Sequence, residues 1–234
     1  MASETRPCGI KSSGTEAPSA ESGYLAGLAP YWDGRFEHEG MVWGEEPSPT
    51  LAQALTAFGA HDARTLLVLG AGYGRNMRPF AQAGMRVDGL DVSGIAAALA
   101  RRLDPALAVT VGSALDAAVC PGPYDAIYCF NLLHLFRADE RQLLVQSMRD
   151  RLAPAGLAFV AAFSRQDASY GRGQQVEPHT FESRPGRPAH YYDAHDLREA
   201  FGGWQVLGEG LVYEPEDHGQ GPHTHALRWI LVRR

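Results

Sequence analysis

The 234-residue sequence has few cysteines, no long apolar run and no excess of basic residues. Cys8, Cys120 and Cys129 form no CxxC or CxxH spacing, which argues against a disulfide framework and a cysteine-based zinc site and favours a cytoplasmic setting. No apolar run approaches the roughly 18 residues of a membrane span, and the N-terminus lacks the apolar segment of a signal peptide. The 21 basic residues are outnumbered by 27 acidic ones, so we expect neither nucleic acid nor a membrane as partner.

The composition changes near residue 24. Residues 1–23 are rich in Ser, Gly, Glu, Ala and Pro, and we expect a flexible tail because so few apolar groups cannot offset the entropy of ordering. Residues 24–60 contain a cluster of aromatic side chains and predict an ordered N-terminal cap. Residues 24–234 are expected to form one domain.

Short apolar runs alternate with helical patterns along this domain. Residues 65–70 (TLLVLG) show no polar alternation, as is typical of a strand buried on both faces. The pattern predicts an α/β fold with one Rossmann-like, doubly wound, seven-stranded sheet, mostly parallel with an antiparallel last strand. The expected strands are residues 65–70, 85–91, 106–111, 124–130, 157–163, 204–213 and 225–232, and the last two are expected to pair as a hairpin. The expected helices are residues 50–60, 75–83, one after Ser93, one opened by a capping box at Asp139 and Gln142, and 193–201.

Residues 164–190 lack clear periodicity, and we expect a long loop on the substrate side of the sheet. Such a loop lies beyond the carboxyl ends of the strands, where α/β folds bind ligands. Its arginines could hold an anionic substrate, although a solvated loop is an equal alternative. They are Arg165, Arg172, Arg184 and Arg187.

The sharpest motif is the glycine-rich turn LGAGYGRN, residues 69–76, between the first strand and the following helix. Glycines there permit a tight turn and a close approach of a ligand to the backbone. Asp91 ends the second strand, where a carboxylate can accept both hydroxyl groups of a ribose. Dinucleotide sites favour G-x-G-x-x-G, whereas the third glycine here comes one place early, at Gly74. An NAD-dependent oxidoreductase and a turn without a ligand remain alternatives.

Four segments resemble, in order, the motifs of class I S-adenosylmethionine (SAM)-dependent methyltransferases: LLVLGAGYGRN, MRVDGLDVS, YDAIYCFNLLHLF and RLAPAGLAFVAAF. The WDGRF and VWGEEPS segments, the GRN ending and the GRGQQVEPHTFE stretch look more like the tellurite-resistance and thiopurine (thiol) branch, which acts on small molecules. The resemblance implies a transferase that uses SAM as cofactor and methylates a small molecule, with a thiol, oxyanion, hydroxyl or amine as acceptor.

Carried over by position, the resemblance also implies a set of cofactor contacts. The glycine-rich turn would line the methionine part of SAM, Asp91 and Val92 would hold the ribose and adenine, and the fourth strand would end beneath the methyl group. The residues implied are Gly70, Ala71, Gly72, Gly74, Arg75, Asn76, Asp91, Val92, Ser113, Ala114, Leu115, Phe130 and Asn131. Val68 and Ser113 stand where the family often has acids. A SAM- or nucleotide-binding protein without catalysis is therefore a second alternative.

Weaker signals concern the cap and the histidines. Trp32 and Trp43 could cover the cofactor, because a sulfonium cation favours aromatic faces, and Arg35 could pair with its carboxylate. His134 is the candidate general base, although a histidine there often has no catalytic role. The remaining histidine cluster could bind a metal, but a polar hairpin rim is favoured, so no metal is predicted. That cluster is His218, His223 and His225. Nothing in the sequence indicates the oligomeric state.

Overall fold

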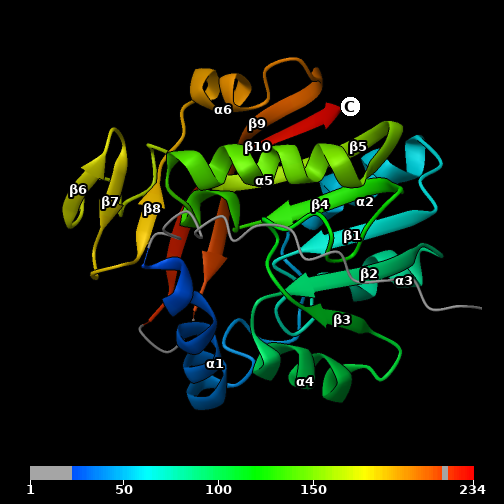
Figure 1. Ribbon diagram of the computed structural model, residues 1–234, viewed down its shortest axis with the longest axis horizontal. Helices are drawn as coiled ribbons and strands as arrows, with labels where there is room; N and C mark the ends of the chain where they lie inside the picture. The colour runs from blue at the N-terminus through cyan, green and yellow to red at the C-terminus, as the bar shows by residue number, and fades with distance from the viewer. Residues whose placement is uncertain (1–22, 218–220) are drawn as a thin grey trace, which may run out of the picture.

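The computed structural model, shown in Figure 1, describes residues 23–217 and 221–234. A seven-stranded sheet forms its centre, in the order β3-β2-β1-β4-β5-β10-β9. The first five strands are parallel, and β10 is antiparallel to both β5 and β9. The strands are β1 (Thr65–Leu69), β2 (Arg86–Asp91), β3 (Ala108–Val111), β4 (Tyr124–Phe130), β5 (Leu152–Phe163), β9 (Gln205–Glu216) and β10 (His223–Arg233). The predicted fold class and the closing hairpin are confirmed.

Helices cover both faces of the sheet, and β1 explains why. Its side chains alternate, so that Leu66 and Val68 join one core while Leu67 and Leu69 join the other. Helices α2, α3 and α4 supply the first core, and α5 and α6 supply the second. The helices are α1 (Leu28–Glu39), α2 (Leu51–Ala60), α3 (Arg78–Gln82), α4 (Gly94–Leu103), α5 (Ala138–Arg151) and α6 (Ala194–Ala200), with short 3-10 turns at Leu25–Gly27 and Leu133–Leu135. No helix in the described ranges has both the length and the apolar character needed to cross a bilayer.

Two helix starts differ from the prediction. The helix expected at residues 75–83 begins only at Arg78, because Gly74 has φ +83° and the following backbone turns tightly, with the Met77 N–H bonded to the Gly74 carbonyl. The capping box at Asp139 and Gln142 is also wrong: α5 begins at Ala138 and has no local side-chain cap. Instead the Ala138 N–H donates to the carboxylate of Glu177, at 3.1 Å. A long-range contact thus replaces the local cap.

The segment at residues 164–190 is not a plain loop. It contains β6 (Gln174–Glu177), β7 (Thr180–Glu182) and β8 (Pro188–His190), which form a separate antiparallel sheet, here called the small sheet. These strands have three or four residues each, too few to show a clear alternation in the sequence. Figure 1 shows the small sheet and α1 at the same end of the molecule, beyond the arrowheads of β1 and β4.

Candidate functional site

A cavity of about 400 Å³ opens at the carboxyl ends of the parallel strands. This is the edge at which open α/β sheets bind their ligands, and the volume suits a small organic molecule. One part of the wall comes from the glycine-rich turn and the ends of β2, β3 and β4; the rest comes from α1, the 3-10 turn after β4, the small sheet and the β9–β10 hairpin.

The glycine-rich turn has the backbone geometry that the sequence predicted. Gly70, Gly72 and Gly74 have φ of +66°, +53° and +83°, a region in which glycine carries no steric penalty. The Gly72 N–H donates to Asp91 Oδ2 at 2.7 Å, and the Ser93 N–H donates to Oδ1 at 2.9 Å. Burial raises the pKa of Asp91, while these two hydrogen bonds act in the opposite direction. The Asp91 carboxylate is therefore fixed in direction beside the cavity.

Residues 41–48 of the N-terminal cap are fastened to this turn by hydrogen bonds. The Tyr73 hydroxyl accepts from the Trp43 N–H at 3.0 Å and donates to the Gly44 carbonyl at 2.7 Å. Arg75 donates to the carbonyls of Trp43 and Glu46, and Asn76 Oδ1 accepts from the Ser48 N–H at 2.9 Å. The side chains of Arg75 and Asn76 thus hold the cap on the turn, in addition to lining the cavity.

Replacing Tyr73 with phenylalanine removes both hydroxyl contacts and leaves the ring in place. Each lost hydrogen bond is worth about 1 kcal/mol, so we expect the free energy of unfolding to fall by about 1 to 2 kcal/mol. Ligand affinity should fall several-fold, because Trp43 would keep its ring contacts and the hydrogen bond from Arg75 but lose its bond to the Tyr73 hydroxyl. Chemical denaturation with and without ligand measures both effects. An unchanged affinity would mean that the cap does not cover the ligand.

Two tryptophans of the cap pack around the side chain of Arg35. The rings of Trp32 and Trp43 lie 6.2 Å apart, and the Arg35 guanidinium lies 5.7 and 5.2 Å from their centroids. Arg35 also bonds to Glu39 at 3.3 Å. All three predicted cap residues line the cavity. Phe36 is buried among the same rings and was missed, although its spacing of four residues from Trp32 places both on one helix face.

The far end of the cavity is built from aromatic and titratable groups. The Phe163 ring stacks on His134 at 4.0 Å and on His225 at 4.8 Å. Burial lowers the pKa of His134 to about 3, so its imidazole is neutral near pH 7 and a poor base. His225 bonds to the buried Asp167 at 2.9 Å. Burial alone would raise the pKa of Asp167, but the hydrogen bonds from His225 and Ser169 lower it to about 2.

Of the four arginines that could hold an anionic substrate, Arg187 alone lines this cavity. Its guanidinium lies 3.4 Å from the centroid of the Tyr31 ring, and it donates to the Gly27 carbonyl at 3.2 Å. Arg165 is instead paired with Asp193 and Asp196. Arg172 and Arg184 are exposed elsewhere. The contact between Arg187 and Tyr31 joins the small sheet to α1 at the rim.

The structure brings together all the predicted site residues except two. Gly74 does not line the cavity, and an added Cβ there would stand 2.7 Å from Leu107. Leu115 packs into the core under α5 and does not line the cavity. His218 lies outside the described residues. Tyr73, Asp167 and Glu216 were missed; Glu216 could have been found only from the register of the hairpin, where it pairs with His223.

Comparisons with known proteins agree with this fold. Residues 66–156 match the model of a family described as a methyltransferase domain. No curated protein sequence matches the chain significantly. Among solved structures, a Burkholderia thailandensis 1,6-didemethyltoxoflavin-N1-methyltransferase, with 1,6-didemethyltoxoflavin and S-adenosylhomocysteine bound, is similar at 19% identity and a TM-score of 0.66, over 96% of this chain and 93% of that one. A SAM-dependent methyltransferase from Anabaena variabilis is similar at 18% identity and a TM-score of 0.68, over 96% of this chain and 100% of that one. TehB from Haemophilus influenzae is similar at 14% identity and a TM-score of 0.61, over 78% of this chain and 62% of that one.

The sheet order, the glycine-rich turn and Asp91 define an α/β protein that binds its ligand at the carboxyl ends of parallel strands. The family match is to the segment that carries this turn. Residues 66–156 thus match a methyltransferase domain, and the chain has the fold of class I SAM-dependent methyltransferases. The matches give no support to the NAD-dependent oxidoreductase alternative.

Proposed function

We propose that the chain is a SAM-dependent methyltransferase that acts on a small molecule, which binds between His134, Phe163 and Arg187 and attacks the methyl group of SAM in line with the sulfur–methyl bond. The contact between Arg187 and Tyr31 carries this proposal, because it joins the cap to the small sheet across the rim. A cavity of about 400 Å³ with such a rim suits a compact acceptor better than a polymer.

The cofactor would occupy the other part of the cavity. Asp91 would accept the ribose hydroxyl groups, since each of its oxygens keeps lone pairs beside the bonds from Gly72 and Ser93. The cap tryptophans would shield the sulfonium. Positioning can supply most of the rate in such a displacement. The pKa of His134 counts against a role as general base, so we assign its ring to the wall of the acceptor site. A cytoplasmic setting stays a prediction; Cys120 and Cys129 are free thiols, which is consistent with it.

Thermal unfolding with SAM, S-adenosylhomocysteine and NAD tests the cofactor site. A ligand at about a hundred times its dissociation constant adds about 2.7 kcal/mol, which raises Tm by about 5 to 10 °C for a domain of this size. We expect this shift with the two SAM-type ligands and none with NAD. Asp91→Ala should lose it. Asp88→Ala is the matched control on the same strand, where the side chain contacts Tyr124 and Arg86, and it should keep the shift.

Formation of S-adenosylhomocysteine in the presence of added acceptors tests the substrate class. We expect turnover with members of a panel of small thiols and small hydroxylated or anionic aromatics, and none with bulk RNA or denatured protein. Turnover with a polymer and with no small molecule would refute the proposal. Tight SAM binding without turnover in any arm would favour the non-catalytic alternative.

A further inference from the structure

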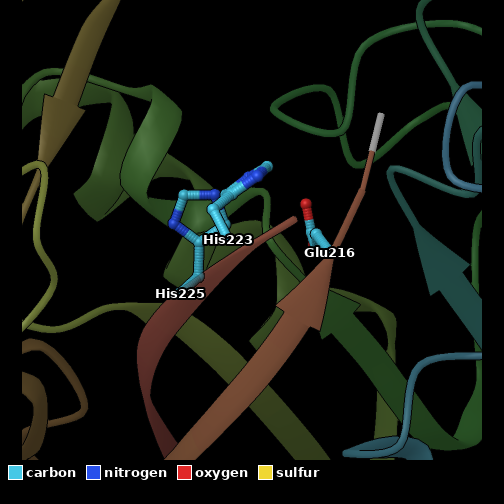
Figure 2. Close-up of side chains that lie close together, drawn as sticks. All are labelled: Glu216, His223 and His225. Atoms are coloured by element: carbon cyan, nitrogen blue, oxygen red, sulfur yellow. The ribbon is translucent and has the colours of Figure 1, made fainter. Parts of the chain in front are cut away.

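We propose that Glu216, His223 and His225 bind a divalent transition-metal ion, and that this ion holds an oxygen or sulfur atom of the methyl acceptor. One carboxylate oxygen of Glu216 and one nitrogen of each imidazole lie within 4.8 Å of one another. Figure 2 shows the two histidines side by side and Glu216 reaching from the neighbouring strand toward the same space. The sequence alone favoured a polar rim here.

The hairpin register produces this arrangement. His223 and His225 are two residues apart on β10, so both side chains point to the same face of the strand. Glu216 is the direct partner of His223 on β9, and directly opposed residues in an antiparallel pair have their Cβ atoms about 5 Å apart. Two imidazoles and one carboxylate are therefore held on one face by backbone pairing.

Hydrogen bonds orient both imidazoles for metal binding. Nδ1 of His225 bonds to the carboxylate of Asp167 at 2.9 Å, and Nδ1 of His223 bonds to the Gly221 carbonyl at 3.1 Å. Both of these partners are acceptors, so each Nδ1 donates its proton and Nε2 is the nitrogen that would bind the metal. Histidine ligands of metals typically donate their other N–H to a carboxylate or a carbonyl in this way.

The donor set indicates the class of metal. Imidazole with one carboxylate suits zinc and similar transition metals, whereas calcium and magnesium favour oxygen ligands alone. Ligand atoms on a tetrahedral zinc lie about 3.4 Å apart. All three residues are partly exposed, so rotations of their side chains can bring the ligand atoms to that spacing. Three protein ligands leave a fourth position open, as in catalytic rather than structural zinc sites.

The open position would serve the reaction. Glu216 and His225 line the same cavity as Asp91, and Phe163 stacks against His225 at the acceptor end. A hydroxyl or thiol bound to the metal loses its proton to water more readily. The deprotonated atom forms the new bond to the methyl carbon while the sulfur–methyl bond breaks, and S-adenosylhomocysteine leaves with the electron pair. This role in catalysis rests on the proposed function, whereas metal binding does not.

Calorimetric titration of the metal-stripped full chain with Zn²⁺, repeated with Co²⁺ and its visible absorption, tests the site without any activity assay. We expect one equivalent to bind, and tetrahedral cobalt bands to appear. His223→Ala and Glu216→Gln should weaken binding at least about tenfold. Asp167→Asn keeps the three ligands and should weaken binding by about 10- to 100-fold through the orientation of His225. His195→Ala, at an exposed histidine on α6, is the matched control and should bind as the unaltered protein does.

Equal losses in His195→Ala and His223→Ala would overturn the inference, because the metal would then be held by surface histidines in general. Loss of binding in neither His223→Ala nor Glu216→Gln would overturn it as well. The SAM-induced thermal shift is measured on the same preparations, so that a failure of the metal site can be distinguished from a failure of the proposed function. Zinc binding without a SAM shift would sink the proposed function, and a SAM shift without zinc binding would sink the metal site.

Discussion

Arg151→Met is expected to lower the free energy of unfolding by about 4 kcal/mol, the largest loss anticipated for any single substitution considered in this molecule. Arg151 has no exposed surface. Its guanidinium donates to the carbonyls of Ala114, at 3.0 Å, and Val119, at 2.9 Å, and also to Asp116 and Ser147. Methionine fills similar space but donates nothing, so one buried and two partly buried carbonyls would each lose a partner at about 1 to 3 kcal/mol.

Arg151→Met should also weaken ligand binding. Residues 114–119 follow β3, and Ala114 lines the cavity, so the guanidinium holds one wall of the site in shape. A fall in Tm of roughly 8 to 16 °C would accompany the lost stability. Arg149→Met is the control on the same helix, where the guanidinium lies over Trp204 and bonds to the Gly203 carbonyl at the surface. We expect less than about 1 kcal/mol there. Denaturant unfolding that gives equal losses for the two variants would contradict this account.

Gly74→Val is expected to cost about 3 kcal/mol and to abolish the SAM-induced thermal shift. Gly74 has φ +83°, and an added Cβ would stand 2.7 Å from Leu107 and 3.6 Å from Ala100. The substitution therefore combines backbone strain, about 1 to 3 kcal/mol, with crowding of a packed core. Relief of either requires the glycine-rich turn to move, and that turn presents the Gly72 N–H to Asp91.

Gly84→Val separates the two causes. Gly84 has a similar φ, +88°, but an added Cβ there would meet no atom within 4 Å. This variant should lose only the strain energy and should keep the thermal shift. Thermal unfolding of both variants, with and without SAM, gives the comparison. A full ligand response in Gly74→Val would mean that the shape of the turn does not matter for binding.

Much of the fold follows from patterns that are local in the sequence. The unbroken apolar run of β1 predicted a strand buried on both faces, and Ser93 was predicted to cap α4, where its hydroxyl does accept from the Ala96 N–H. What could not be predicted depends on contacts between distant residues. Glu177 caps α5 from the small sheet, 39 positions away. Asp33 on α1 accepts from the Ser93 hydroxyl at 2.6 Å, across 60 positions.

The candidate site divides in the same way. The wall formed by the glycine-rich turn and Asp91 was predictable, because the glycine spacing and the acid at the end of β2 are short motifs. The acceptor end was not, because it is assembled from the small sheet, the hairpin and α1. Asp167 illustrates the difficulty: its partners, His225 and the Ala226 N–H, lie 58 and 59 positions away. No motif within one segment encodes such a contact.

The position of the tryptophans gives this protein a built-in optical reporter. Trp32 and Trp43 line the cavity. Trp229 packs against the hydrophobic core on one face of the sheet, and Trp204 belongs to the core on the other face. Indole emission shifts with the polarity and the charge around the ring, and the Arg35 guanidinium lies 5.2 Å from Trp43. A ligand that displaces water from the cap changes the fluorescence of one pair and leaves the other as an internal reference. Binding to the unlabelled chain can therefore be followed in real time.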